Sequence, residues 1–93
     1  MIAPELKISR SEKAVARRLE EGEGGVILHL ESGAYHGVNE VGLVIWELLE
    51  GKPTHRELVD ALRERIDDPP AHLEDDVSEF LTQVRERDLI VVE

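Results

Sequence analysis

The segment from residue 39 to residue 51 constrains the fold of this chain more than any other. Apolar residues recur there with the spacing of one helical face, and others extend the apolar surface around the cylinder: Val41, Val44, Ile45 and Leu48, then Leu43, Trp46 and Leu49. A helix that is apolar on nearly every side must be covered by protein on several sides. We therefore expect a central helix that begins after the N-cap residue Asn39 and ends at Gly51, with Pro53 preventing its continuation.

Two more helices are expected after the central one. Thr54 and Glu57 have the spacing of a capping box, in which each side chain binds the backbone N–H of the other residue. The helix that starts there is expected to bury Leu58, Val59, Leu62 and Ile66. Pro69 and Pro70 then interrupt the chain, and a third helix carries Leu73, Val77, Phe80, Leu81 and Val84. It should end near Asp88, and residues 89–92 form a short extended tail.

Three short strands are expected ahead of the central helix. In the middle one, one face is fully apolar, as expected of a half-buried strand, because Val26, Leu28 and Leu30 alternate with Ile27, His29 and Glu31. Glycine-containing turns at residues 22–25 and 32–33 bracket this strand. The third strand spans Ala34 to Val38, and the first spans about Ala14 to Leu19, where the composition would equally suit a short helix.

These elements predict an α+β domain in which a three-stranded antiparallel sheet is followed by three helices. A winged-helix-like architecture is the simplest one with those parts. A chain of 93 residues has room for a single domain with one modest core, which should be mainly aliphatic because only three residues are aromatic. Residues 1–12 precede the first expected strand as an N-terminal extension whose role is open.

The charge of the chain disfavours several classes of partner. It has 21 acidic residues against 11 lysines and arginines, a formal net charge of -10, which repels nucleic acid and anionic lipid. Four of the acids, Glu74, Asp75, Asp76 and Glu79, fall on the third helix, which a winged-helix protein would place in a DNA groove. No stretch resembles a signal peptide or a membrane span. We therefore expect a cytoplasmic protein with no nucleic-acid or membrane partner.

The sequence contains no constellation of catalytic or metal-binding residues. Cysteine is absent, and the four histidines, His29, His36, His55 and His72, do not have the spacing of a metal site. We expect each of them to face solvent, and we expect no cofactor and no metal. No serine has the context of a nucleophile, and the glycines at residues 22–25 are flanked by glutamates, which predicts a turn rather than a phosphate-binding loop. An enzymatic function is therefore not expected.

The third strand is the more promising surface. In a simple meander it lies at the edge of the sheet, where the N–H and C=O groups of one side lack partners. Natural edge strands are usually protected by lysine, proline or a bulge, and residues 34–38 contain neither lysine nor proline. An edge left open in this way favours the addition of a peptide strand. Gly37 would allow another backbone to approach, or it eases the turn into the helix at Asn39; Tyr35 would be a core residue at the rim or part of a peptide pocket.

Several segments, in order and spacing, resemble the PqqD-like family of peptide-recognition domains, also called RiPP recognition elements. They are Glu31-Ser32-Gly33-Ala34-Tyr35-His36-Gly37-Val38-Asn39, Trp46-Glu47-Leu48-Leu49-Glu50-Gly51, residues 54–62, Asp76-Val77 with Phe80-Leu81, and Leu89-Ile90. Together they extend over about residues 14–92. A free-standing chain of this size is most similar to the leader-binding proteins of lasso-peptide biosynthesis. The sequence departs from the family at Val38, where leucine is frequent, and in the residues before Lys13.

The resemblance implies a non-catalytic function. The leader of a ribosomally made precursor peptide would add as an antiparallel strand to the third strand and lie in a cleft against the third helix. Lasso leaders offer a tyrosine, a proline and a leucine as anchors, and the acidic third helix would favour leaders that carry lysine or arginine. The domain would deliver the peptide to a separate leader peptidase and a macrocyclase. By motif position, the implied leader-binding residues are Ala34, Tyr35, His36, Gly37, Val38, Asp76, Val77, Phe80, Leu81 and Val84.

Two other classes of function remain open at this point. A winged-helix DNA-binding regulator would share the fold, although the acidic third helix disfavours it. A structural subunit that pairs its edge strand with that of a second copy would use the same open strand for dimerisation.

Overall fold

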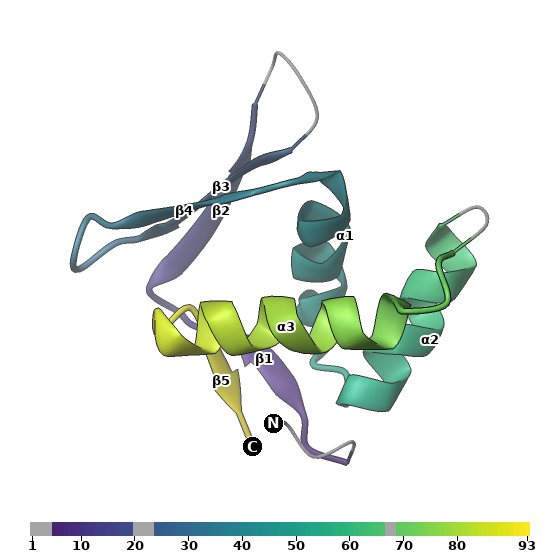
Figure 1. Ribbon diagram of the computed structural model, residues 1–93. Coiled ribbons are helices and arrows are strands. Elements are labelled where there is room, and N and C mark those ends of the chain that lie inside the picture. Colours follow the sequence, from purple (N-terminus) through teal and green to yellow (C-terminus); the bar gives the residue numbers. More distant parts are fainter. Residues whose placement is uncertain (1–4, 20–23, 67–68) are drawn as a thin grey trace.

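The computed structural model describes residues 5–19, 24–66 and 69–93 and has the α+β architecture that the sequence predicts (Figure 1). Its elements follow one another as β1 (Ile8–Arg10), β2 (Ala14–Arg18), β3 (Gly25–His29), β4 (Tyr35–Val38), α1 (Glu40–Leu48), the 3-10 turn η1 (Leu49–Gly51), α2 (His55–Arg65), α3 (Leu73–Glu86) and β5 (Ile90–Val92). The three-stranded sheet and the three helices are confirmed. Within these residues, no helix is both long enough and apolar enough to cross a membrane.

The main sheet is an antiparallel meander in the order β2-β3-β4, so β4 lies at an edge. Leu28 of β3 pairs with Tyr35 of β4, and Gly25 pairs with Val38 at the other end. The predicted position of the third strand at the sheet edge is therefore confirmed. From β4 the chain passes directly into α1, which brings the helical half of the molecule under the sheet (Figure 1).

The first two helices begin at the predicted caps. The side chain of Asn39 accepts a hydrogen bond from the backbone N–H of Gly42 at 2.8 Å and starts α1. The capping box of α2 is complete, because Thr54 Oγ1 accepts from Glu57 N at 3.2 Å and Glu57 Oε1 accepts from Thr54 N at 2.9 Å. The hydrogen bond from the backbone of Thr54, and to a smaller extent the one with its side chain, lower the pKa of Glu57. Local capping chemistry thus fixes where both helices start.

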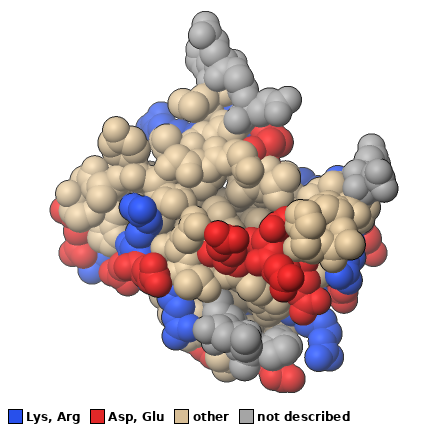
Figure 2. Space-filling model, viewed as in Figure 1, with Lys and Arg blue, Asp and Glu red and all other residues tan. Residues whose placement is uncertain are grey.

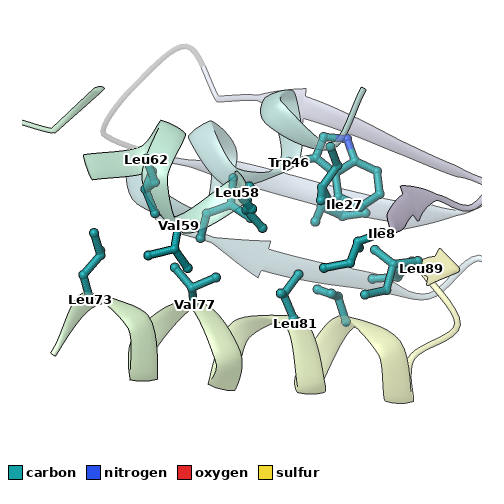
Figure 3. Close-up of a cluster of buried hydrophobic side chains, with 14 residues drawn as sticks. Ile8, Ile27, Trp46, Leu58, Val59, Leu62, Leu73, Val77, Leu81 and Leu89 are labelled. Atoms are coloured by element: carbon teal, nitrogen blue, oxygen red, sulfur yellow. The ribbon is translucent and has the colours of Figure 1, made fainter. Parts of the chain in front are cut away.

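The core lies where one face of α3 meets α2, the small strands and the sheet (Figure 3). Leu73, Val77, Leu81 and Val84 form the buried stripe of α3. Facing them are Leu58, Val59 and Leu62 of α2, together with Ile8, Ile27, Leu89 and Ile90 from the strands and their flanks. The side chains of Leu43, Ile45 and Trp46 are buried on different sides of α1, as expected of a central helix.

The apolar alternation predicts that Val26, Leu28 and Leu30 of the β3 segment face the core. In the structure the opposite face of β3 is turned toward the core. Ile27 is fully buried and His29 is 7% exposed, whereas Leu30 is 57% exposed. The pairing register explains this, because it places Ala14 and Ala16 of β2 on the same face as Ile27. Small side chains let the helices approach this face closely. The larger side chains of Val15, Leu28 and Tyr35 share the outer face, which the described residues leave uncovered.

Two of the four histidines are buried, in contrast to the prediction that each faces solvent. His55 is 6% exposed, and its Nε2 lies 3.0 Å from the hydroxyl oxygen of Ser78, which links α2 to α3. His29 is held in the turn between β3 and β4 by two backbone N–H groups. Both rings occupy core positions because hydrogen bonds compensate for the water that they lose.

The N-terminal extension contributes a strand that the sequence did not predict. β1 pairs antiparallel with β5, with Ile8 opposite Val92. Lys7 and Glu93 exchange two backbone hydrogen bonds of 2.8 Å, and Ile8 N donates to Pro53 O at 2.8 Å. The side chain of Ile8 is fully buried in the core. Residues 7–10 therefore belong to the folded domain.

This packing predicts a large difference between two neighbouring positions. Ile8→Ala should lower the free energy of unfolding by about 2–5 kcal/mol, because it leaves a cavity beneath β1 and β5. Leu6→Ala, at a side chain that is 38% exposed, should change it by about 0.5 kcal/mol or less. Urea unfolding of both variants measures the difference, and equal effects would show that β1 is not a core element.

Candidate functional site

The free edge of β4 is the first part of the candidate site. His29 N donates to Ala34 O at 2.8 Å, so these two residues form a hydrogen-bonded pair. In an antiparallel ladder every second pair is of this kind, which makes Ile27 with His36 and Gly25 with Val38 the next hydrogen-bonded pairs. The N–H and C=O groups of Tyr35 and Gly37 consequently point away from β3. No strand of the described residues pairs with them. The edge therefore offers two residues, with four main-chain groups, to an added strand.

The second part of the site is the side of α3 that flanks its buried stripe. In Figure 1, α3 runs alongside β4 below the sheet. Asp76 and Phe80 lie one turn apart on one side of this helix, Arg87 follows its last residue, and each of the three lines a cavity. One cavity lies at the Val38 end of β4 and the other at the Tyr35 end. The edge of β4, the flanking side of α3 and these two cavities are named here together the β4–α3 groove.

The cavity at the Val38 end is mainly apolar and has a volume of about 250 Å³. Its lining comes from the start of α1, the end of α2 and the first half of α3: Asn39, Val41, Gly42, Ile45, Ile66, Pro70, Leu73, Asp76, Val77 and Phe80. Gly42 shapes it, because a Cβ atom there would lie 3.0 Å from Val38 Cβ and 3.2 Å from Phe80 Cε1. Asp76 is the charged residue of this lining. The cavity can accept an apolar side chain beside a carboxylate.

The cavity at the Tyr35 end is smaller, about 150 Å³, and has a different charge. It is lined by Ile27, His29, Ala34, Tyr35, His36, Arg87 and Leu89. Burial, and secondarily the positive charge of Arg87, lower the pKa of His36, so its imidazole is neutral at neutral pH. The groove is therefore acidic at one end and carries a guanidinium at the other.

The structure brings most of the predicted site residues together, but not all of them on the groove surface. Residues 34–38 form the edge, and Asp76 and Phe80 face it from α3. Val77 forms part of the floor of the apolar cavity, while Leu81 and Val84 are fully buried in the core. Arg87, Leu89 and Gly42 line the groove without having been predicted. The spacing of Asp76, Phe80 and Arg87, by four and then seven residues, is the signal that would have identified Arg87.

Acidic side chains gather over the first turns of α3, beside the groove (Figure 2). They are Glu74, Asp75, Asp76 and Glu79, all exposed. His72 Nδ1 lies 2.6 Å from Asp76 Oδ2, one helical turn along. Among the described residues, no three histidine, aspartate or glutamate side chains are grouped to hold a metal ion. This acidic surface instead makes the groove attractive to positively charged side chains.

A second concave region, of about 660 Å³, lies at the opposite edge of the sheet, between β2 and α1. Here Arg18 crosses from the strand to the helix, with its guanidinium 2.7 Å from Glu40 and 3.2 Å from Glu47. The backbone N–H of Ala14 is already used by Ser11 O at 3.1 Å. These contacts occupy the β2 edge in part. The β4 edge is the more open of the two.

Comparison with known proteins gives the chain a family. The family model of coenzyme PQQ synthesis protein D (PqqD) matches residues 24–90. A solved structure described as TbiB1 in complex with the TbiA(beta) leader peptide is similar at 30% identity and a TM-score of 0.72, covering 88% of this chain and 93% of that one. A lasso peptide synthetase B1 complexed with the leader peptide has the same fold at 17% identity, with a TM-score of 0.71 over 90% of this chain and 96% of that one. A search of curated protein sequences finds no match.

The environment of His36 predicts how this residue titrates. Its pKa should lie below the ordinary value of about 6.5, and Arg87→Gln should raise it without restoring that value, because burial remains. Proton NMR of the imidazole against pH measures both, with Arg85→Gln as the control.

The same shift links His36 to stability. Because the folded state favours the neutral ring, the free energy of unfolding should fall as the pH drops from about 6.5 to the lower pKa of the folded state. A pKa at or above 6.5 in the native protein would contradict this description of the groove.

Proposed function

Because this chain belongs to the PqqD family, we propose that it is a non-catalytic protein that binds the leader segment of a ribosomally made precursor peptide in the β4–α3 groove. The observation that carries the proposal is the open edge of β4 with a helix wall and two cavities beside it. Strand addition and groove binding would then act together. The described leader complex of a relative at 30% identity supports the same assignment.

Strand addition would supply affinity that depends little on sequence. The outward N–H and C=O groups of Tyr35 and Gly37 can form four hydrogen bonds with an antiparallel leader strand. Gly37 has open space around its α-carbon, because a Cβ atom there would meet nothing within 4 Å. Alternate side chains of the added strand would point toward α3 and away from it. The side chains that point toward α3 would carry the selectivity.

The antiparallel direction sets which part of the leader lies at which end. β4 runs from Tyr35 to Val38, so the upstream residues of the leader would lie beside Val38 and the downstream residues beside Tyr35. An apolar anchor would enter the 250 Å³ cavity next to Phe80. A lysine or arginine upstream of it would approach Asp76 and Glu79. An acidic residue would be better tolerated downstream, near Arg87.

We propose that this domain acts in lasso-peptide biosynthesis, with a separate leader peptidase and a macrocyclase as partners. Holding the leader would raise the effective concentration of the core peptide at their active sites. Delivery requires a surface that stays accessible when the groove is filled. The outer face of the sheet lies across the sheet from α3 and provides an apolar surface of this kind, formed by Val15, Leu28 and Tyr35.

The alternative functions fit these observations less well. A DNA-binding regulator would present α3 to phosphates, and the acids of its first turns oppose that contact. Dimerisation through β4 would use the same main-chain groups as the leader. The two uses are separable, because a β4-paired dimer would dissociate when leader peptide is added, as sizing by light scattering would detect.

Substitution at Gly37 tests strand addition. Gly37→Pro removes an outward N–H and should weaken binding of a fluorescein-labelled leader peptide by at least roughly tenfold, since it also places a ring in the path of the added strand. The probes are the leader of a precursor encoded beside this gene and the TbiA(beta) leader, read by fluorescence polarisation.

Gly37→Ala is the matched control, because it adds a methyl group in open space and keeps the N–H. It should bind nearly as well as the native protein. Circular dichroism of both variants checks the fold, since the N–H of residue 37 makes no bond to β3. Native affinity in the proline variant would rule out an added strand at this edge.

Charge reversal tests the electrostatic part. Asp76→Lys with Glu79→Lys should weaken binding of a leader with an upstream lysine or arginine by roughly threefold to tenfold at low salt, and by less at about 0.5 M salt. Glu50→Lys with Glu64→Lys changes the net charge equally at exposed positions on η1 and α2. This control should bind like the native protein. Equal losses in the two double variants would mean that only the overall charge matters.

A further inference from the structure

The imidazole of His29 holds the turn from which β4 starts. Its Nδ1 atom lies 3.3 Å from the backbone nitrogen of Glu31 and 3.3 Å from that of Ser32, and both N–H groups donate to it. Two donors directed at Nδ1 leave no place for a proton there, so the neutral ring carries its proton on Nε2. The orientation of this buried ring is therefore fixed by the turn.

Nε2 of the buried His29 ring lies 3.6 Å from Oδ2 of Asp88, whose side chain is 86% exposed and lies just beyond the end of α3. Asp88 ends the helix with φ at 60°, in the left-handed region. The hydrogen bonds of the helix end, Leu89 N to Val84 O at 3.0 Å and Asp88 N to Arg85 O at 3.1 Å, form the motif in which glycine is usual at this position. An aspartate is less favourable there than glycine, so its presence lowers stability relative to glycine.

We propose that Asp88 and His29 are positioning residues that hold the two walls of the β4–α3 groove together at the Tyr35 end. Asp88 belongs to the α3 wall, and His29 to the sheet wall. The cavity between the two walls is bounded by Arg87 and Leu89 on the helix side and by His36 on the strand side. An aspartate in place of the usual glycine puts a carboxylate opposite His29. This inference rests on the proposed function, since the width of the groove matters only when a peptide occupies it.

The inference predicts opposite effects of one substitution on stability and on binding. Asp88→Gly should raise the midpoint of thermal unfolding by roughly 2–5 °C, because it relieves the left-handed strain. It should also weaken binding of the labelled leader peptides by roughly threefold to tenfold, because α3 and the turn are no longer linked. A residue with only a structural role would move both quantities in the same direction.

Lys52→Gly is the matched control, because Lys52 has φ at 53° and lines neither cavity of the groove. It should raise the midpoint without changing affinity. Asp88→Asn should retain most of the affinity, because asparagine tolerates the left-handed conformation and its amide oxygen can face Nε2.

Amide hydrogen exchange of the unliganded protein tests the link without a peptide. The amides of Glu31 and Ser32 should exchange faster in Asp88→Gly than in the native protein, and at the native rate in Lys52→Gly. Native exchange rates in Asp88→Gly, or native affinity in that variant, would overturn the inference. If the native protein binds neither leader peptide, the proposed function fails instead, and the exchange rates still decide whether the link exists.

Discussion

The packing of one stripe of α3 against the core determines where the groove can be. Leu73, Val77, Leu81 and Val84 are buried together against α2 and the strands, so the helix has no freedom to rotate. Asp76 and Phe80 on the flanking side, and Arg87 after the last residue of the helix, are consequently held toward β4. A functional surface on a chain this small depends on that arrangement, because the same helix must both complete the core and form a wall of the site.

Much of the fold is readable from local chemistry. The caps Asn39 and Thr54 located the first two helices and the glycines the turns beside β3, because these residues act on their immediate neighbours. The third helix was located by Pro69, Pro70 and its apolar spacing, and the strand β2 was left open between a strand and a short helix. The orientation of the sheet was not readable, since both faces of β3 carry apolar residues. The small side chains of Ala14 and Ala16, on another strand, decide which face meets the helices. β1 was not predicted because the residues that pair with it, in β5, lie 80 to 84 positions away in the sequence.

The candidate site, like the fold, was predictable from the sequence only in part. The open strand was predictable, because an edge position and the absence of lysine and proline are properties of one segment. The helix wall was predictable only as a helix. Phe80, Leu81 and Val84 are all apolar, yet only Phe80 borders the groove while the other two fill the core. Asp88 and His29 carry no local signature, since their relation exists only once the end of α3 reaches the turn between β3 and β4.

The pairing of β1 with β5 has a consequence for synthesis on the ribosome. The core cannot close until residues 90–92 have been made, whereas β2, β3 and β4 are joined by short connections and can pair earlier. During that interval the nascent chain presents an open strand edge before the helix that borders it is in place, a state in which chains aggregate. Residues 1–65 hold 12 acidic and 9 basic residues, so charge repulsion between neighbouring nascent chains is weak during that interval. Residues 66–93, which close the core, hold nine acidic and two basic residues, so most of the negative charge is added together with the helix that borders the edge.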